Sequence, residues 1–196
     1  MSSRWRQTTP RELIDWLAAV DVPRAIAGGW ALDLWQGAVT RPHSDIEIAC
    51  FRADLHRLLP KLPAFEIVIA RSKQLTPYAI GEALPDDSFS LWLRRRGETL
   101  WDFEIVVEEQ RGGLWAYRRE PTITRPVADV LTSAGGVPII APEIQLLYKC
   151  RDPRPKDVED LRRCVPRLDA RAYAWLHEAV ARAHAAFLPD LEGMRR

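Results

Sequence analysis

The chain contains 196 residues with a formal net charge of +1, and 47% of its residues are hydrophobic. This length suits one domain, or one domain with a small helical addition, and the composition is ordinary for a globular protein. The near-neutral charge argues against stable binding of nucleic acid, because proteins dedicated to that role are usually basic.

The first part of the chain alternates between helical and extended patterns. Apolar residues recur at helical spacing over residues 10–20, which predicts an amphipathic helix. The short apolar segment 25–27 is interrupted by a glycine pair, and a second helical pattern covers 30–36. Strands are predicted over residues 46–51, 65–70, 88–94 and 99–107, with a helix over 52–62.

The second part of the chain changes character at Pro142. Residues 108–141 contain two glycine pairs and several prolines, and we expect them to be irregular, with one or two short strands such as 137–140. Helices are predicted over residues 143–150, 156–164 and 169–187. These patterns predict an α+β fold with a mixed sheet flanked by helices over residues 1–141, followed by a C-terminal helical subdomain over residues 142–196.

Neither the cysteines nor the apolar segments indicate secretion or membrane insertion. Cys50, Cys150 and Cys164 are odd in number and lack C-x-x-C spacing, which argues against a disulfide framework and a zinc site. Free buried thiols are the expected alternative. No run approaches the roughly 18 apolar residues of a membrane span, and no signal region follows the first residues. We therefore expect a cytoplasmic protein that makes no membrane contact.

Asp45 and Glu47 are the strongest candidates for a metal site. In an extended segment, residues two apart point to the same face, so these two carboxylates would project side by side. Like charges at that spacing repel each other, and a divalent cation relieves the repulsion. Carboxylate oxygens favour Mg²⁺ over zinc. The alternative, for this pair alone, is a solvent-facing strand with incidental charges.

Two further features support a catalytic site. Gly28 and Gly29 stand where an apolar segment meets a helical pattern, and a glycine pair there lets phosphate groups approach backbone amides at a helix N-terminus. Asp102 and Glu104 share one face of a later strand whose opposite face is apolar. An ordinary tight turn is the alternative for the glycines, and a wet edge strand is the alternative for the acidic pair.

Together these segments resemble the nucleotidyltransferase superfamily of the polymerase-β type. Within it, the run Gly28-Gly29-Trp30-Ala31-Leu32-Asp33 is similar to a motif of the aminoglycoside and lincosamide nucleotidyltransferases. The same holds for the segment 41–48, Arg-Pro-His-Ser-Asp-Ile-Glu-Ile, and for Leu100-Trp101-Asp102. The helical segments 141–149 and 154–161 resemble the C-terminal half of relatives in the same family. One departure is Glu47, where many members have Asp.

The resemblance implies a reaction and a set of site residues. A nucleoside monophosphate, most simply AMP from ATP although another nucleoside triphosphate is open, would pass to a hydroxyl group of a small-molecule acceptor. Either Asp102 or Glu104 would accept the hydroxyl proton. The residues implied for Mg²⁺ are Asp45, Glu47 and Asp102. The residues implied for the nucleotide are Gly28, Gly29, Arg41, His43 and Lys149.

Several functional alternatives follow from the same motifs. The acceptor could be an aminoglycoside, a lincosamide or a metabolic hydroxyl compound. An antitoxin-like enzyme that modifies a protein or RNA is the second reading, and an inactive relative that only binds nucleotide is the third. Intact carboxylates at positions 45, 47 and 102 argue against the third reading. The sequence leaves the oligomeric state open.

Overall fold

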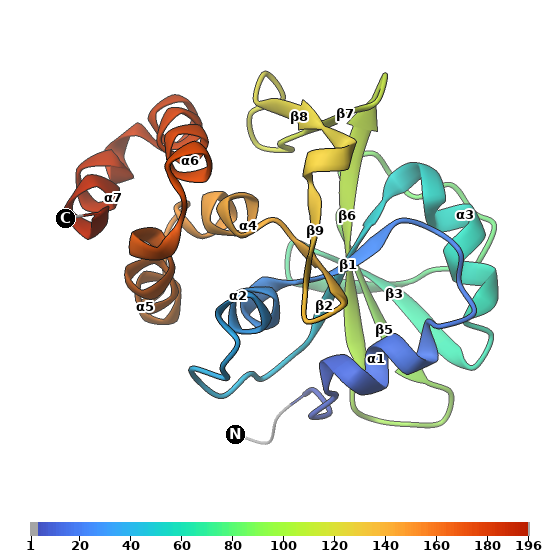
Figure 1. Cartoon of the computed structure of the whole chain (residues 1–196). Coiled ribbons are helices and arrows are strands. Elements are labelled where there is room, and N and C mark those ends of the chain that lie inside the picture. Colours follow the sequence, from blue (N-terminus) through green and yellow to red (C-terminus); the bar gives the residue numbers. More distant parts are fainter. Residues whose placement is uncertain (1–3, 196) are drawn as a thin grey trace.

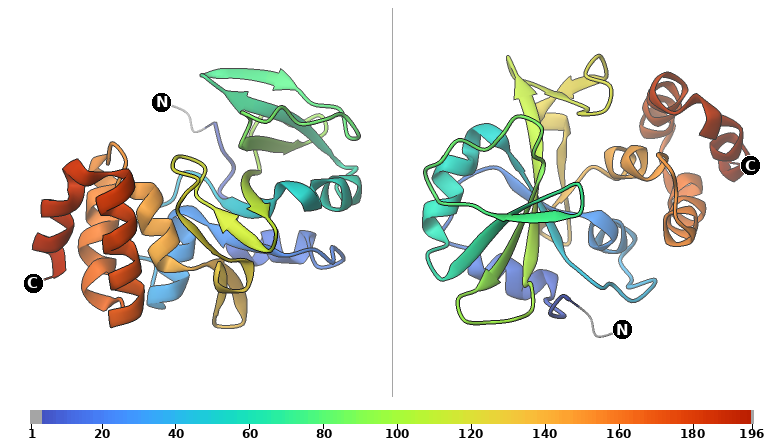
Figure 2. Two further views of the ribbon diagram at one scale, coloured as in Figure 1. Left: turned by 90° about the horizontal axis from the view of Figure 1, so that it is seen from above. Right: turned by 180° about the vertical axis from the view of Figure 1, so that it is seen from behind.

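The computed structural model describes residues 4–195, and it shows a twisted mixed sheet with helices on both sides (Figure 1). The C-terminal helices group on one side of the molecule, while α1 and α3 lie on the other. Figure 2 shows the C-terminal helices and the strands β3–β5 at opposite ends. The predicted α+β class is confirmed.

The sheet contains ten strands in the order β4-β3-β5-β6-β2-β1-β10-β9, with β7 and β8 continuing from β6. Two neighbouring pairs are parallel, β2 with β6 and β1 with β10, and the other pairs are antiparallel. The strands are β1 Arg24–Ala27, β2 Glu47–Phe51, β3 Phe65–Arg71, β4 Gln74–Pro77, β5 Ser90–Arg95, β6 Phe103–Arg111, β7 Leu114–Ala116, β8 Thr124–Pro126, β9 Leu131–Ala134 and β10 Val137–Ile140.

The helices are α1 Pro10–Trp16, α2 Gly28–Gln36, α3 Leu55–Leu58, α4 Pro142–Lys149, α5 Pro155–Cys164, α6 Ala170–Ala183 and α7 Leu188–Arg195. Helix α1 begins as predicted, with Thr9 and Glu12 forming a capping box. It ends earlier than residue 20, although Leu17 and Val20 remain buried in a turn. The predicted helix over 52–62 is divided into α3 and two short 3₁₀ turns.

The segment 108–141 corrects the sequence prediction. It contains four strands or parts of strands beyond β6, rather than one or two. The glycine pair Gly112-Gly113, with φ angles of 57° and 79°, makes the tight turn between β6 and β7. Two consecutive positive φ angles are what a two-residue hairpin turn requires. The pair Gly135-Gly136 joins β9 to β10 in the same way.

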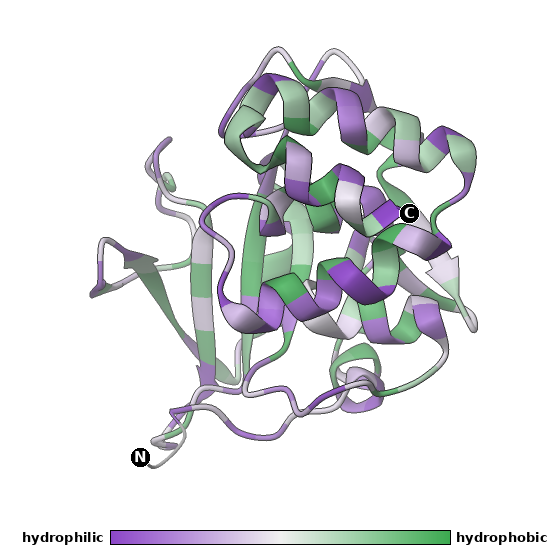
Figure 3. Cartoon of the chain, turned by 90° about the vertical axis from the view of Figure 1, so that its left-hand side faces the viewer, coloured by the Kyte–Doolittle hydropathy of each residue, from purple (hydrophilic) through white to green (hydrophobic). Residues whose placement is uncertain are grey.

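Two hydrophobic clusters lie against the sheet. One contains Leu13, Leu58, Leu91 and Phe103. The other joins the sheet to the C-terminal helices, because residues of β1 and α2 pack with Ile144, Leu147 and Leu161. Figure 3 shows hydrophilic and hydrophobic residues alternating along these helices, as expected where one side is buried. Helices do begin at Pro142, but they share this core with the sheet, so a division at residue 141 stays a prediction.

All three cysteines are free and buried, as expected. Removal from water raises the pKa of each thiol to about 12. Across residues 4–195, none of the helices combines the length and apolar character needed to cross a membrane.

Candidate active site

A polar pocket of about 300 Å³ opens where the start of α2, strand β6 and helix α4 meet. The chain segments that line it are the α2 N-terminus, the loop before β2, one face of β6, and the α4–α5 region. The predicted site residues found in its wall are Gly28, Gly29, Arg41, His43, Asp45, Glu47, Glu104 and Lys149. The sheet topology therefore brings together residues that lie more than a hundred positions apart.

The parallel pairing of β2 with β6 places Glu104 directly beside Glu47. Partial burial and the charge of Asp45 raise the pKa of Glu47. Burial and the charge of Glu47 raise the pKa of Glu104 to about 8. Within residues 4–195, none of these three carboxylates forms an ion pair. The three side chains form one acidic centre in the pocket wall.

Asp102 is not part of this centre, which corrects its prediction as metal ligand and base. Its carboxylate is fully buried and pairs with Arg6 at 2.9 Å and Arg95 at 3.2 Å. It also accepts the backbone N–H of Arg95 at 2.8 Å. Asp102 precedes β6 and lies roughly 6.6 Å along the chain from Glu104, at the usual rise of a strand. The register of β6 therefore presents Glu104, and not Asp102, to Glu47.

The two glycines are needed for close packing. Gly28 has a φ angle of +67°, and a Cβ atom there would come within 2.9 Å of the Glu47 carboxyl carbon. A Cβ atom on Gly29 would lie 2.7 Å from Cε1 of His43. The N–H of Gly28 donates to Oε1 of Gln145 at 2.7 Å, so this amide already has a partner. The first-turn amides of Gly29 and Trp30 are the ones left for a phosphate group.

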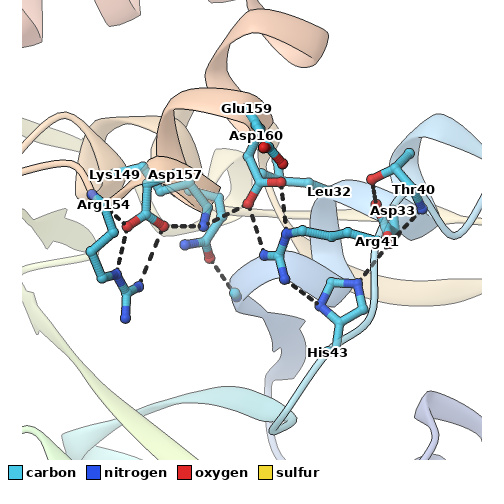
Figure 4. A network of polar contacts seen from close by, with 12 residues as sticks. Leu32, Asp33, Thr40, Arg41, His43, Lys149, Arg154, Asp157, Glu159 and Asp160 are labelled. Atoms are coloured by element: carbon cyan, nitrogen blue, oxygen red, sulfur yellow. Dashed lines mark hydrogen bonds and ion pairs between the residues drawn. The ribbon is translucent and has the colours of Figure 1, made fainter.

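Arg41, His43 and Lys149 belong to a continuous polar network (Figure 4). Arg41 donates to both oxygens of Asp160, at 3.0 and 2.9 Å, and also to Nδ1 of His43 at 3.2 Å. Lys149 Nζ lies 2.9 Å from Asp157 and 2.9 Å from Asp160. The predicted nucleotide-binding cations are thus held by carboxylates on α5.

Sequence reasoning missed several residues of this site. Asp33, Asp157 and Asp160 are buried, and each binds cations or donors that border the pocket. Asp33 and Asp160 stand inside the motifs at 28–33 and 154–161, but an isolated acidic residue on a helix carries no signal about its partner. Glu108, also buried in the pocket wall, accepts from Trp115 at 2.7 Å and Tyr148 at 2.8 Å.

Comparison with known proteins agrees with the motifs. Residues 11–80 match the family model of aminoglycoside-2''-adenylyltransferase. No curated protein sequence matches the chain. A crystal structure of the lincosamide antibiotic adenylyltransferase LnuA, bound to lincomycin, is similar with a TM-score of 0.53 at 20% identity. That similarity covers 79% of this chain and 95% of the other, and it shows a shared fold.

Two further solved structures are similar at lower scores. The enzyme ANT(2'')-Ia in complex with adenylyl-2''-tobramycin gives a TM-score of 0.48 at 15% identity, covering 94% of both chains. An antigenic nucleotidyltransferase-like protein from Paracoccidioides brasiliensis gives 0.46 at 16% identity, covering 92% of this chain and 88% of the other. The family match over residues 11–80 and the shared fold together indicate a nucleotidyltransferase, as the sequence motifs predict.

Proposed function

We propose that the protein is a Mg²⁺-dependent nucleotidyltransferase that transfers AMP from ATP to a hydroxyl group of a small molecule. The observation that carries this proposal is the centre formed by Asp45, Glu47 and Glu104, which shares a pocket with the N-terminus of α2 and forms no ion pair with residues 4–195. A triphosphate placed there would meet free helix amides on one side and a site for its metal ion on the other.

The carboxylates of the pocket can bind Mg²⁺ only together with phosphate oxygens of the nucleotide. Within the part of the chain that the structure describes, no group of three or more His, Cys, Asp or Glu side chains converges closely enough to hold a metal ion. Mg²⁺ is commonly bound by one or two carboxylates together with the phosphates of a substrate. Asp45 and Glu47 can supply these two carboxylates, and all their donors are oxygen atoms. When bound, Mg²⁺ would neutralise charge on the phosphates as the bond to pyrophosphate breaks.

The residues of the chain would then carry out the transfer. The acceptor hydroxyl oxygen forms a bond to the α-phosphorus, and the bond from that phosphorus to the pyrophosphate oxygen breaks. The hydroxyl proton passes to the ionised form of Glu104, which its raised pKa makes a stronger base than an ordinary carboxylate. Gly29 and Trp30 hold phosphate oxygens through their amides, and pyrophosphate leaves.

Two arginines in the pocket lining support a choice between two classes of acceptor. Arg118 and Arg119 border the pocket with their guanidinium carbons 5.0 and 5.5 Å from the centre of the Tyr148 ring. Neither forms an ion pair within residues 4–195. Aminoglycosides carry several positive charges, whereas lincosamides carry one amine. We therefore propose a lincosamide-like acceptor in preference to a polycationic aminoglycoside.

The test is an activity assay. Purified protein is mixed with Mg²⁺, one labelled nucleoside triphosphate at a time, and either lincomycin or tobramycin. We expect pyrophosphate release with ATP that depends on both Mg²⁺ and the acceptor, and that is faster with lincomycin. The metal-free control contains EDTA. If calorimetry with a non-hydrolysable ATP analogue gives equal affinity in Mg²⁺ and in EDTA, the proposed function is wrong. Inhibitory concentrations in a susceptible bacterium then test the resistance role separately.

A further inference from the structure

The loop between α2 and β2 carries Asp45, and it is fixed to two different helices. On one side, Asp33 of α2 accepts the N–H of Thr40 at 3.0 Å and its hydroxyl at 2.6 Å. On the other side, Arg41 pairs with Asp160 of α5. Asp45 lies four positions beyond Arg41, so both attachments act just before the proposed metal ligand.

His43 links the two attachments. Arg41 can only donate, so Nδ1 of His43 must accept its hydrogen bond. Nε2 then carries the proton and donates to Asp33 at 2.6 Å. A single chain of hydrogen bonds therefore runs from α5 through the loop to α2 (Figure 4).

Asp160 connects this series of hydrogen bonds to the C-terminal helices. Its side chain is 3% exposed and contacts three cations, Arg41, Lys149 and Arg163. Burial by itself would raise the pKa of Asp160, but the hydrogen bond from Arg41 and the charge of Lys149 lower it. The hydrogen bond to Asp160 also raises the pKa of Arg41. The carboxylate is therefore held in its charged form.

We propose that Asp160 is a positioning residue for the metal-binding loop, acting through Arg41 and Lys149. This proposal rests on the proposed function only in naming the ligand, Mg²⁺ with a nucleoside triphosphate. Asp160 does not line the pocket and carries the wrong charge to bind phosphate. Its contribution is to fix Arg41, and with it the segment that ends at Asp45, against α5.

One substitution distinguishes this role from a purely electrostatic effect, because the two explanations predict opposite changes in triphosphate affinity. Asp160→Asn removes a negative charge close to the pocket, so on charge alone the triphosphate should bind equally well or more tightly. If Asp160 positions the loop, the same substitution should weaken binding. Loss of residues that orient metal ligands commonly costs about 10- to 100-fold in metal affinity or activity.

The measurement is calorimetric binding of a non-hydrolysable ATP analogue with Mg²⁺ to the full chain. We expect Asp160→Asn to bind at least about tenfold more weakly than wild type. Glu159→Gln is the matched control, because it removes the same charge from the neighbouring position of α5, where the side chain is 58% exposed. It should bind within about twofold of wild type, since exposed ion pairs contribute little.

Two further variants keep the test informative if Asp160→Asn folds poorly. Arg41→Gln breaks the bond to the loop and leaves Asp160 with Lys149 and Arg163. Arg163→Gln removes a bond of 2.7 Å to the same carboxylate but does not touch the loop. We expect weakened binding in the first variant only. In the double variant with Asp160→Asn, Arg41→Gln should add little, because coupled residues are not additive.

Hydrogen exchange distinguishes failure of this proposal from failure of the proposed function. Without nucleotide, amides over residues 38–46 should exchange faster in Asp160→Asn than in Glu159→Gln. If exchange in that segment is the same in both variants, or if Asp160→Asn binds the analogue as tightly as wild type, the positioning role is overturned. Wild type that fails to bind the analogue while the exchange difference persists would reject only the nucleotide assignment.

Discussion

The pocket and the neighbouring helix α5 contain two sets of carboxylates whose environments shift their pKa values in opposite directions. On the sheet, Glu47 and Glu104 form no ion pair with residues 4–195. Burial raises both pKa values, and a neighbouring carboxylate raises them further, Asp45 for Glu47 and Glu47 for Glu104. On α5, burial also opposes charge, but hydrogen bonds from Arg154 and Lys149 to Asp157 and from Arg41 to Asp160 lower both pKa values. Both sets are carboxylates, Glu on the sheet and Asp on α5, and they differ in their partners.

This difference assigns the two sets different roles. Carboxylates that repel each other in a pocket and form no ion pair within residues 4–195 favour a cation supplied from outside the chain. Carboxylates that already bind Arg and Lys side chains have no capacity left for a metal ion, and they orient those side chains instead. The comparison predicts that substitutions on the sheet change activity, whereas substitutions on α5 change stability or geometry.

The largest expected effect is on activity, in Asp45→Asn. The amide keeps the shape of the side chain but loses the charge proposed to bind Mg²⁺. With the acceptor that the screen identifies, turnover should fall by about a thousandfold, the scale of a lost electrostatic contribution to a transition state. The melting temperature, measured in parallel, should be unchanged because Asp45 forms no ion pair in the described structure. Turnover within about tenfold of wild type would contradict the assignment of Asp45 as a metal ligand.

Two substitutions near the start of β6 test whether Glu104 or Asp102 is the general base. Glu104→Gln should lower turnover by about a hundredfold, a typical contribution of general base catalysis. Asp102→Asn should leave turnover within about threefold, well under 1 kcal/mol of barrier, but lower stability because it weakens the contacts to Arg6 and Arg95. The reverse result would restore Asp102 as the base.

On α5, Asp157→Asn should act on stability. Lys149 and Arg154 would lose a charged partner, at a cost of about 2 kcal/mol in the free energy of unfolding. Since the folded pKa of Asp157 is lowered, its contribution is present above the unfolded pKa of about 3.9 and is lost as the pH falls below it. Urea unfolding of both proteins at pH 7 and pH 3 measures this. A constant difference at both pH values contradicts the ion-pair explanation.

The smallest expected effect is the stabilisation that Mg²⁺ adds to protein already saturated with a non-hydrolysable ATP analogue. At ten times its dissociation constant, the ion should add about 1.4 kcal/mol to the free energy of unfolding, or roughly 3–6 °C in melting temperature. Glu47→Gln should abolish most of this rise, and NaCl at matched ionic strength serves as the control. An equal rise in wild type and Glu47→Gln would show that the ion binds elsewhere.

The sequence predicts much of the site because short spacing rules work within one strand or turn. Asp45, Glu47 and the glycine pair lie close together in the chain, and their geometry follows from local backbone. The choice between Asp102 and Glu104 depends on the register between β2 and β6, and register is set by long-range pairing that one strand does not reveal. Asp160 contacts Arg41 across 119 positions, which no local pattern reports.

The fold was predictable to a similar degree. Long periodic segments such as α2, β6 and α6 were recognised within a few residues. Strand β4 was missed because the turn before it, Ser72-Lys73, has positive φ angles of 50° and 65° without any glycine to signal it. Helix α7 was also missed. The predicted helix over 169–187 covers α6 and the 3₁₀ turn Ala185–Phe187, and it ends where α7 begins at Leu188.

The buried thiols offer a way to observe the two halves of the molecule separately. Cys50 lies in β2, within the cluster that supports the sheet, whereas Cys150 and Cys164 belong to the cluster under the C-terminal helices. Each thiol is inert while buried, because the thiolate is the reactive form and its pKa is about 12. Modification by a thiol reagent, mapped by mass spectrometry, would therefore report which cluster opens first.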